Sequence, residues 1–279
     1  HIHWLNMESL YSNIHYWLVD HPTISQFEWK QGHTFGSSIS FLTISVSVYL
    51  CLTLLSLRFS TFIPTLTTIT IRNITAIHSL ILCLLSLLMV IAGILSVQHQ
   101  MPPHDWKWIV CFPGANHTLP RGPVFFWIYI CYLSKIIEFI DTLLIVLSSS
   151  RSRRLSFLHV YHHALVTVLG YIGLQYAQSM LGLALIVNAS IHVLMYAYYF
   201  LSAIGKRPWW KKLVTNCQIY QFMLGFIISA MMLYYHFTTE FGCTGVGAWC
   251  FGIVFNASLL VLFLDFHSKN YTNNIKKEL

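Results

Sequence analysis

The sequence is dominated by seven long apolar stretches, which constrain its fold more than any other feature. Each is close to the roughly 20 residues that a helix needs to cross the hydrocarbon core of a bilayer. Only 9% of the residues are charged, whereas soluble domains are about 25% charged. We therefore expect an all-α integral membrane protein with seven transmembrane helices, at about 37–57, 75–97, 123–147, 157–177, 180–203, 213–236 and 243–266.

Lysine and arginine indicate how these helices are oriented. With seven spans, twelve of the 16 basic residues fall on one side of the membrane, and six or eight spans would spoil this segregation. The other side carries Lys30, Lys107 and Arg121, while Lys135 lies inside the third span. Because loops rich in basic residues stay in the cytosol, we expect a lumenal amino terminus and a cytosolic carboxyl terminus.

The segments that flank the membrane domain carry their own signals. The amino-terminal residues are mixed and aromatic, which is typical of an interfacial helix and loop, and Met7 is expected to be the natural start. Lys276 and Lys277 stand where a dilysine signal for retrieval to the endoplasmic reticulum would lie, although a chance basic tail would look the same. We therefore expect residence in the endoplasmic reticulum membrane, with an interfacial segment (1–36), a membrane domain (37–266) and a cytosolic tail (267–279).

Polar residues recur at helical spacing in four of the predicted spans. Ionisable groups are costly in hydrocarbon, so they are expected to face protein or water. Each cluster alone has a structural explanation: an ion-pair seam, a satisfied core histidine, an interfacial belt of tyrosines, or amides that join helices. On the expected topology, however, all four lie in the cytosolic half of the bilayer, which predicts one cavity open to the cytosol. The clusters are Lys135, Glu138, Asp141 and Thr142; His159, His162 and His163; Asn188, His192, Met195, Tyr196, Tyr198 and Tyr199; and Thr215, Gln218 and Gln221.

In order and spacing, the four clusters resemble the motifs of the ELO family of very-long-chain fatty acid elongases. The resemblance covers about residues 30–268, and the amino-terminal Tyr16-Trp17-Leu18-Val19 is similar to plant ELO-like members. The matching motifs are KxxExxDT from Lys135, HxxHH from His159, HxxMYxYY from His192 and TxxQxxQ from Thr215.

The resemblance implies a 3-oxoacyl-CoA synthase, an acyltransferase built around a central acyl channel. Such an enzyme joins a fatty acyl-CoA to malonyl-CoA, giving a longer 3-oxoacyl-CoA, carbon dioxide and CoA, with no cofactor or metal. No cysteine lies in the histidine clusters, and an acyl-imidazole is an activated acyl donor, so an imidazole nucleophile is chemically competent. The resemblance supports this route and implies that the middle histidine, His162, carries the acyl group. We expect His192 to handle the malonyl unit. His159 and His163 would orient and polarise the reacting groups, and Asp141 would fix an imidazole tautomer.

Residues around this centre are expected to bind the two substrates. Cations and amides suit the phosphates of CoA and the malonyl carboxylate, and an apolar channel leading toward the lumen would hold the acyl chain. The candidate substrate-binding residues are Lys135, Glu138, Asn188, Tyr196, Tyr199, Gln218, Gln221, Lys206 and Arg207, with Lys211 and Lys212 beside them.

Partners follow from the same resemblance. Besides the two CoA substrates and membrane lipid, the expected partners are the other enzymes of the elongation cycle, namely a ketoacyl reductase, a dehydratase and an enoyl reductase. The sequence leaves open whether the protein forms a homo-oligomer. The net charge of +7 is explained by membrane orientation and anionic substrates, so nucleic acid is not expected as a partner.

Two other classes of protein share some of these features. A membrane di-iron desaturase or hydroxylase also uses HxxHH, but it needs more than the four histidines counted in the spans. His99 and His104 have a suitable spacing, yet they are expected on the lumenal side. A seven-span receptor or transporter fits the number of spans but not the four motifs.

The cysteines suggest one disulfide, between Cys111 and Cys243. Both are expected in lumenal loops, and the lumen is oxidising. Cys250 lies deeper in the seventh span and is a poorer partner. The alternative is that both are free thiols.

Overall fold

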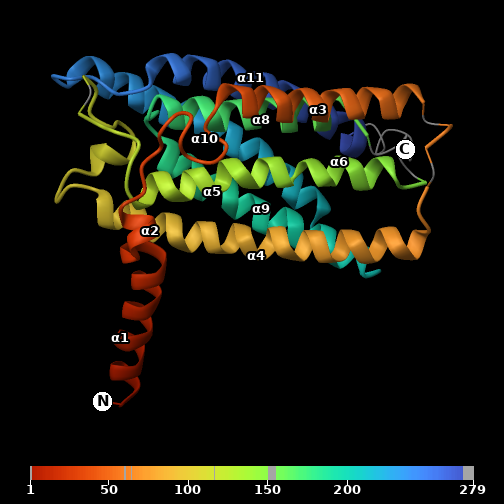
Figure 1. The fold of residues 1–279 in the computed structure, drawn as a ribbon, viewed down its shortest axis with the longest axis horizontal. Coiled ribbons are helices and arrows are strands. Elements are labelled where there is room, and N and C mark those ends of the chain that lie inside the picture. Colours follow the sequence, from red (N-terminus) through yellow and green to blue (C-terminus); the bar gives the residue numbers. More distant parts are fainter. Residues whose placement is uncertain (1, 60, 64, 116, 150–154, 273–279) are drawn as a thin grey trace.

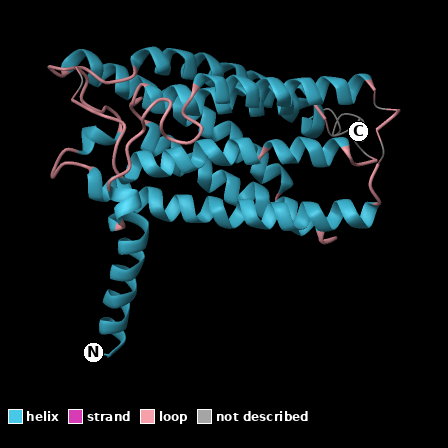
Figure 2. Ribbon diagram, in the orientation of Figure 1, coloured by secondary structure: helices cyan, strands magenta, loops and turns pink. Residues whose placement is uncertain are grey.

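The computed structural model of the chain is a bundle of helices (Figures 1 and 2). It describes residues 2–59, 61–63, 65–115, 117–149 and 155–272, and these contain no strand beyond two isolated bridges, Glu28 with Arg121 and Pro113 with Cys243. Arg151, Arg153 and Arg154 and the dilysine residues Lys276 and Lys277 lie outside the described residues.

Six helices in the described part of the chain are long and apolar enough to cross a membrane. Three begin at Ser or Thr residues, Ser38, Thr67 and Ser156, whose hydroxyl oxygens accept a hydrogen bond from a first-turn backbone N–H. The six are α3 (Ile39–Arg58), α4 (Thr68–Gln100), α8 (Phe157–Gln175), α9 (Leu181–Ala203), α10 (Lys211–Thr238) and α11 (Val246–His267).

The third predicted span forms two helices, α5 (Pro123–Ile137) and α6 (Phe139–Val146), which run in line across the bundle (Figure 1). The interruption is at Glu138, whose carbonyl accepts from Asp141 N at 3.0 Å, three residues on, as in a tighter 3₁₀ turn. The fold is thus all-helical in the described residues, with six helices that could each span the membrane. That α5 and α6 together form a seventh span remains a prediction.

The helices form a closed ring in the order α4, α5, α8, α11, α10 and α9, where each packs against the next and α9 returns to α4. Helix α3 lies outside this ring, against α8 and α6. Its outer face exposes Ile44, Val48, Leu52 and Leu55, as expected of a lipid-facing surface. The interior of the ring is therefore separated from lipid.

The amino-terminal segment stands apart from the ring. Helix α1 (Ile2–His15) projects away from the bundle at a steep angle to the long helices (Figure 1) and exposes Leu10 and Tyr11. A π-helical turn, η1 (Tyr16–Asp20), and the short α2 (Pro22–Ser25) connect it to the bundle. This direction suits the predicted interfacial helix, because long helices cross the bilayer while α1 would lie along its surface.

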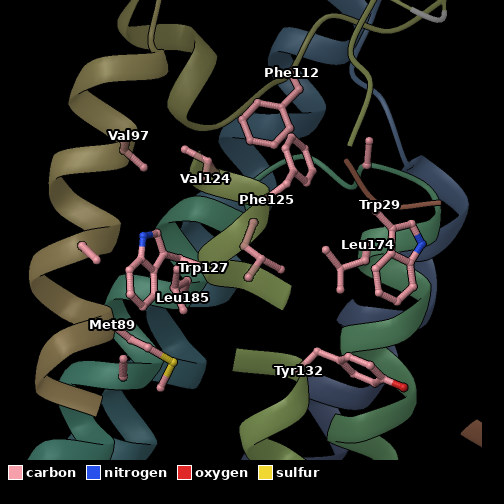
Figure 3. Close-up of a cluster of buried hydrophobic side chains, with 14 of the residues drawn as sticks. Trp29, Met89, Val97, Phe112, Val124, Phe125, Trp127, Tyr132, Leu174 and Leu185 are labelled. Atoms are coloured by element: carbon pink, nitrogen blue, oxygen red, sulfur yellow. The ribbon is translucent and has the colours of Figure 1, made fainter. Parts of the chain in front are cut away.

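A hydrophobic core fills one end of the ring. Trp29, Phe112, Phe125, Tyr132 and Leu174 are all buried there (Figure 3). The 3₁₀ turn η2 (Trp106–Ile109) and the loops before α5 and α11 cover this end, whereas η3 (Ser268–Thr272) lies after α11 at the other. Large side chains close one end and leave room for a site toward the other.

Cys111 and Cys243 form the expected disulfide, with their Cα atoms 5.0 Å apart. Backbone hydrogen bonds support it on both sides: Thr244 N donates to Phe112 O, and Gly114 N donates to Gly242 O. The bridge therefore ties the loop after α4 to the loop before α11. We call this end of the bundle the disulfide end.

Candidate active site

A buried ion pair lies at the interruption between α5 and α6. Lys135 Nζ donates to Glu138 Oε1 at 2.9 Å, and the two residues are 4% and 2% exposed. His192 of α9 meets both, with Nδ1 3.4 Å from Glu138 Oε1 and Nε2 3.4 Å from Lys135 Nζ. Because an unpaired charge is very costly at this depth, the three groups hold one another in place.

The second carboxylate oxygen of Glu138 points to His163. Glu138 Oε2 lies 3.9 Å from His163 Nδ1, and both atoms are buried without a hydrogen-bond partner among the described residues. Buried polar atoms are usually satisfied. These two therefore remain available to a polar group of a ligand or to water.

A second network surrounds Asp141, just beyond the ion pair. Tyr196 OH donates to Asp141 Oδ2 at 2.8 Å, and His78 Nε2 lies 3.1 Å from Asp141 Oδ1. Next to it, Thr142 Oγ1 lies 2.8 Å from His159 Nε2 and 3.0 Å from Tyr49 OH. These contacts join α3, α4, α6, α8 and α9, so they fix the orientation of the His159 ring from several helices.

His78 and Tyr49 are not among the site residues expected from the sequence. The count of four histidines in the predicted spans was wrong, because His78 lies in the second apolar stretch. An ionisable residue inside a predicted span is itself a signal of a functional site, and this signal could have identified His78. Tyr49 is one hydroxyl in an apolar run, and no comparable signal marks it.

Two cavities meet at the histidines. The polar cavity, of about 650 Å³, is bordered by His159, His163 and His192 among others. The apolar cavity, of about 240 Å³, reaches toward the disulfide end as far as Met180. Residues His162, Asn188, Gln221 and Phe222 line both. His162 thus stands at the junction, where it can face a polar ligand on one side and an apolar one on the other.

Most of the predicted site residues are brought together in this way. Lys135 lines the apolar cavity, and Tyr196 is fully buried behind Asp141. The others line the polar cavity: Glu138, Asp141, His159, His162, His163, Asn188, His192, Tyr199, Gln218 and Gln221.

Three predicted cations, Lys206, Arg207 and Lys212, are not part of either cavity lining. Lys206 and Arg207 lie after the end of α9. The predicted Lys211 does line the polar cavity, together with Arg72, which was not predicted. Arg72 donates from Nε to Ala203 O at 2.8 Å, which holds it against the end of α9. Only the packing of α4 on α9 places Arg72 there.

These features define a class: a multi-pass, all-helical membrane protein whose helix ring encloses a cluster of histidines and buried charges. Residues 34–279 match the ELO (GNS1/SUR4) family. The chain is 35% identical to fatty acid elongase A of Dictyostelium discoideum over 264 residues. This alignment covers 92% of this chain and 93% of that protein. The chain belongs to the ELO (GNS1/SUR4) family.

Two further relatives are similar over much of their length. Fatty acid elongase 3-like of Arabidopsis thaliana is 29% identical over 277 residues, covering 95% of this chain and 94% of that protein. Very long chain fatty acid elongase 2 of Mus musculus is 32% identical over 223 residues, covering 76% of this chain and 70% of that protein. Family membership favours the elongase interpretation of the four motifs over the desaturase and receptor alternatives.

Proposed function

We propose that this protein is the condensing enzyme of fatty acid elongation, joining a fatty acyl-CoA to malonyl-CoA. The observation that carries the proposal is the position of His162, at the junction of the polar and apolar cavities. An acyl-CoA has the same two-part character, with a polar CoA and an apolar chain that meet at the thioester. The three relatives described above are named fatty acid elongases, which supports a role in fatty acid elongation.

In the first step, a ring nitrogen of His162 attacks the thioester carbonyl of the fatty acyl-CoA. A carbon–nitrogen bond forms and the carbon–sulfur bond breaks. The CoA sulfur leaves with the bond's electron pair and takes up the proton that the imidazole loses. The acyl chain then lies in the apolar cavity, attached to His162.

In the second step, malonyl-CoA loses carbon dioxide, and the electron pair of the broken bond forms an enolate. Its carbon attacks the acyl-imidazole carbonyl. A carbon–carbon bond forms, the carbon–nitrogen bond breaks, and one proton from solvent restores neutral His162. The product is a 3-oxoacyl-CoA.

Neighbouring residues suit the second substrate. His192 faces the polar cavity while it is held by Lys135 and Glu138. Arg72 and Lys211, which line the same cavity, are suitable partners for the phosphates of CoA, because cations concentrate anionic ligands. Asp141 and Thr142 would act as positioning residues through Tyr196 and His159.

The test is the activity of His162→Ala, measured as radiolabel transferred from malonyl-CoA to a longer acyl product. Loss of the nucleophile should lower turnover by at least about 10³-fold, as for nucleophiles of other acyl-transfer enzymes. Cys131→Ser is the matched control, because Cys131 is the free thiol that lines the apolar cavity. It should keep its activity.

Trapping distinguishes the nucleophile directly. Incubation with acyl-CoA alone, followed by peptide mass analysis, should find an acyl group on His162. An adduct on Cys131, or full activity of His162→Ala, would contradict the proposed intermediate.

We also propose that the chain resides in the endoplasmic reticulum membrane. The disulfide end of the bundle would face the lumen, and the opposite end, with the polar cavity, would face the cytosol. The segregation of basic residues supports this orientation. An epitope added after Leu279 should be digested by protease in sealed microsomes. The glycosylation sequon Asn116-His117-Thr118, whose Asn116 lies outside the described residues, is expected on the lumenal side, so any glycan should disappear with Asn116→Gln. An epitope protected from the protease would show that the carboxyl terminus is lumenal and would contradict the proposed topology.

A further inference from the structure

Three potential metal ligands meet outside the candidate active site, at the corner where α1 joins the bundle. His15 ends α1, Asp20 ends η1, and His99 lies in the last turn of α4. His15 Nδ1–H donates to Asp20 Oδ2 at 2.7 Å, and His99 Nδ1 lies 4.0 Å from Asp20 Oδ1. One ligand atom from each residue lies within 4.8 Å of the other two.

The local backbone explains why the first two residues meet. In a π-helical turn the backbone hydrogen bonds join residues five apart rather than four, so His15 and Asp20 come onto one face. The hydrogen bond from His21 N to Tyr16 O has the same spacing. His99 reaches this face from α4, and its ring centroid lies 5.5 Å from that of His15.

We propose that His15, Asp20 and His99 form a binding site for a divalent transition metal ion, with Zn²⁺ as the best fit. Two imidazoles and a carboxylate are ligands that zinc commonly takes, and three of them leave a fourth tetrahedral position for water. Zinc–ligand bonds of about 2.0–2.2 Å place neighbouring ligand atoms about 3.3 Å apart. The two imidazoles face different oxygens of the Asp20 carboxylate, His15 at 2.7 Å from Oδ2 and His99 at 4.0 Å from Oδ1, while one ligand atom from each residue lies within 4.8 Å of the others. Small side-chain rotations would bring the three ligands to zinc-binding distances.

The surroundings allow an ion to enter and bind. The side chains of His15, Asp20 and His99 are 22%, 43% and 46% exposed, so the ligands can be reached from solvent. Binding would replace the proton on His15 Nδ1, because a coordinating imidazole must offer a free lone pair. The ion would then fasten the corner between α1 and the bundle to the end of α4 (Figure 1).

The experiment is a Co²⁺ titration of the full-length chain, purified in detergent without a polyhistidine tag, with Zn²⁺ as competitor. Visible absorption bands of tetrahedral cobalt should appear, saturate at one ion per chain and disappear on addition of zinc. Asp20→Asn and His99→Ala should weaken binding by at least about tenfold. The matched control is His33→Ala, an exposed histidine of the loop before α3, which should bind as the wild type does.

A second measurement does not depend on spectroscopy. Zinc should slow hydrogen exchange in residues 8–20 of the wild type but not of Asp20→Asn. Every variant retains His1 and His3, so those residues cannot account for a difference between variants. The proposal is overturned if no tetrahedral cobalt spectrum appears, or if Asp20→Asn binds zinc as tightly as the wild type. The outcome is independent of condensing activity, so it also separates this site from the proposed function.

Discussion

The Lys135–Glu138 pair shows how a membrane interior accepts charge. The two groups neutralise each other, and His192 contacts both, so none is left as an isolated charge in a medium that solvates it poorly. The pair also ties the last turn of α5 to Glu138, the residue at which the helix is interrupted before α6. Its loss should therefore affect folding as well as the site.

We expect Glu138→Gln to lower the free energy of unfolding by about 3–5 kcal/mol, because the buried ammonium of Lys135 would lose its counter-ion. Thermal unfolding in detergent measures this. The exposed pair Glu28–Lys30, 3.0 Å apart, provides the control. Glu28→Gln should cost less than about 1 kcal/mol.

A double-mutant cycle tests whether charge pairing is the cause. Lys135→Met combined with Glu138→Gln removes both charges, so the double variant should lose clearly less stability than the two single variants added together. If the losses add to within about 0.5 kcal/mol, the residues are not coupled and this explanation is wrong.

At the scale of elements, the close approach of α11 to the turn between α8 and α9 depends on one glycine. Gly245, just before α11, has a φ of +73°, and a Cβ atom there would collide with the backbone of Gln178. Ser179 N donates to Thr244 O in the same region, so the two segments are held together by their backbones. This contact positions the start of α11 and the first turn of α9, and the first turn of α9 lines the apolar cavity.

Gly245→Ala should therefore destabilise the protein by about 2–4 kcal/mol, through backbone strain and steric overlap. Gly247 is the matched control, since a Cβ there meets nothing within 4 Å. Gly247→Ala lies inside α11, where alanine is the better helix former, and should be neutral or stabilising by less than about 1 kcal/mol. Equal melting temperatures for the two variants would contradict this account.

For the whole molecule, the disulfide closes the end of the bundle opposite the polar cavity. It links positions 132 residues apart and so joins the loop after α4 to the loop before α11. Long closed loops restrict the unfolded chain most in the chain-entropy account, although the bilayer already restrains this chain. The stabilisation should lie toward the lower part of the usual range.

Cys243→Ser should lower the free energy of unfolding by about 2–3 kcal/mol, and reductant should lower the melting temperature of the wild type but not of this variant. Cys250→Ser, which changes an exposed free thiol on α11, should behave as the wild type in both conditions. A wild type insensitive to reductant would argue against a stabilising role for the bridge.

Local patterns determined much of this protein from sequence alone. Apolar length predicted where six spanning helices form, and helical periodicity predicted which polar residues share a helix face. The common depth of the clusters predicted that His162, His192 and Gln218 would border one space, as they do. Cys111 and Cys243 could be paired because the expected topology placed both on the lumenal side, one in a loop and the other at the very start of the seventh span.

Tertiary structure alone decided how those faces meet. Spacing along one helix cannot show which side chain of another helix lies opposite, because that depends on how the helices pack. The contacts of His78 and Tyr49 with the Asp141–Thr142 pair, and of Arg72 with the end of α9, arise in this way. The interruption at Glu138 likewise could not be predicted, because no proline or glycine lies there. Sequence periodicity therefore identifies the chemical groups, while helix packing sets the distances between them.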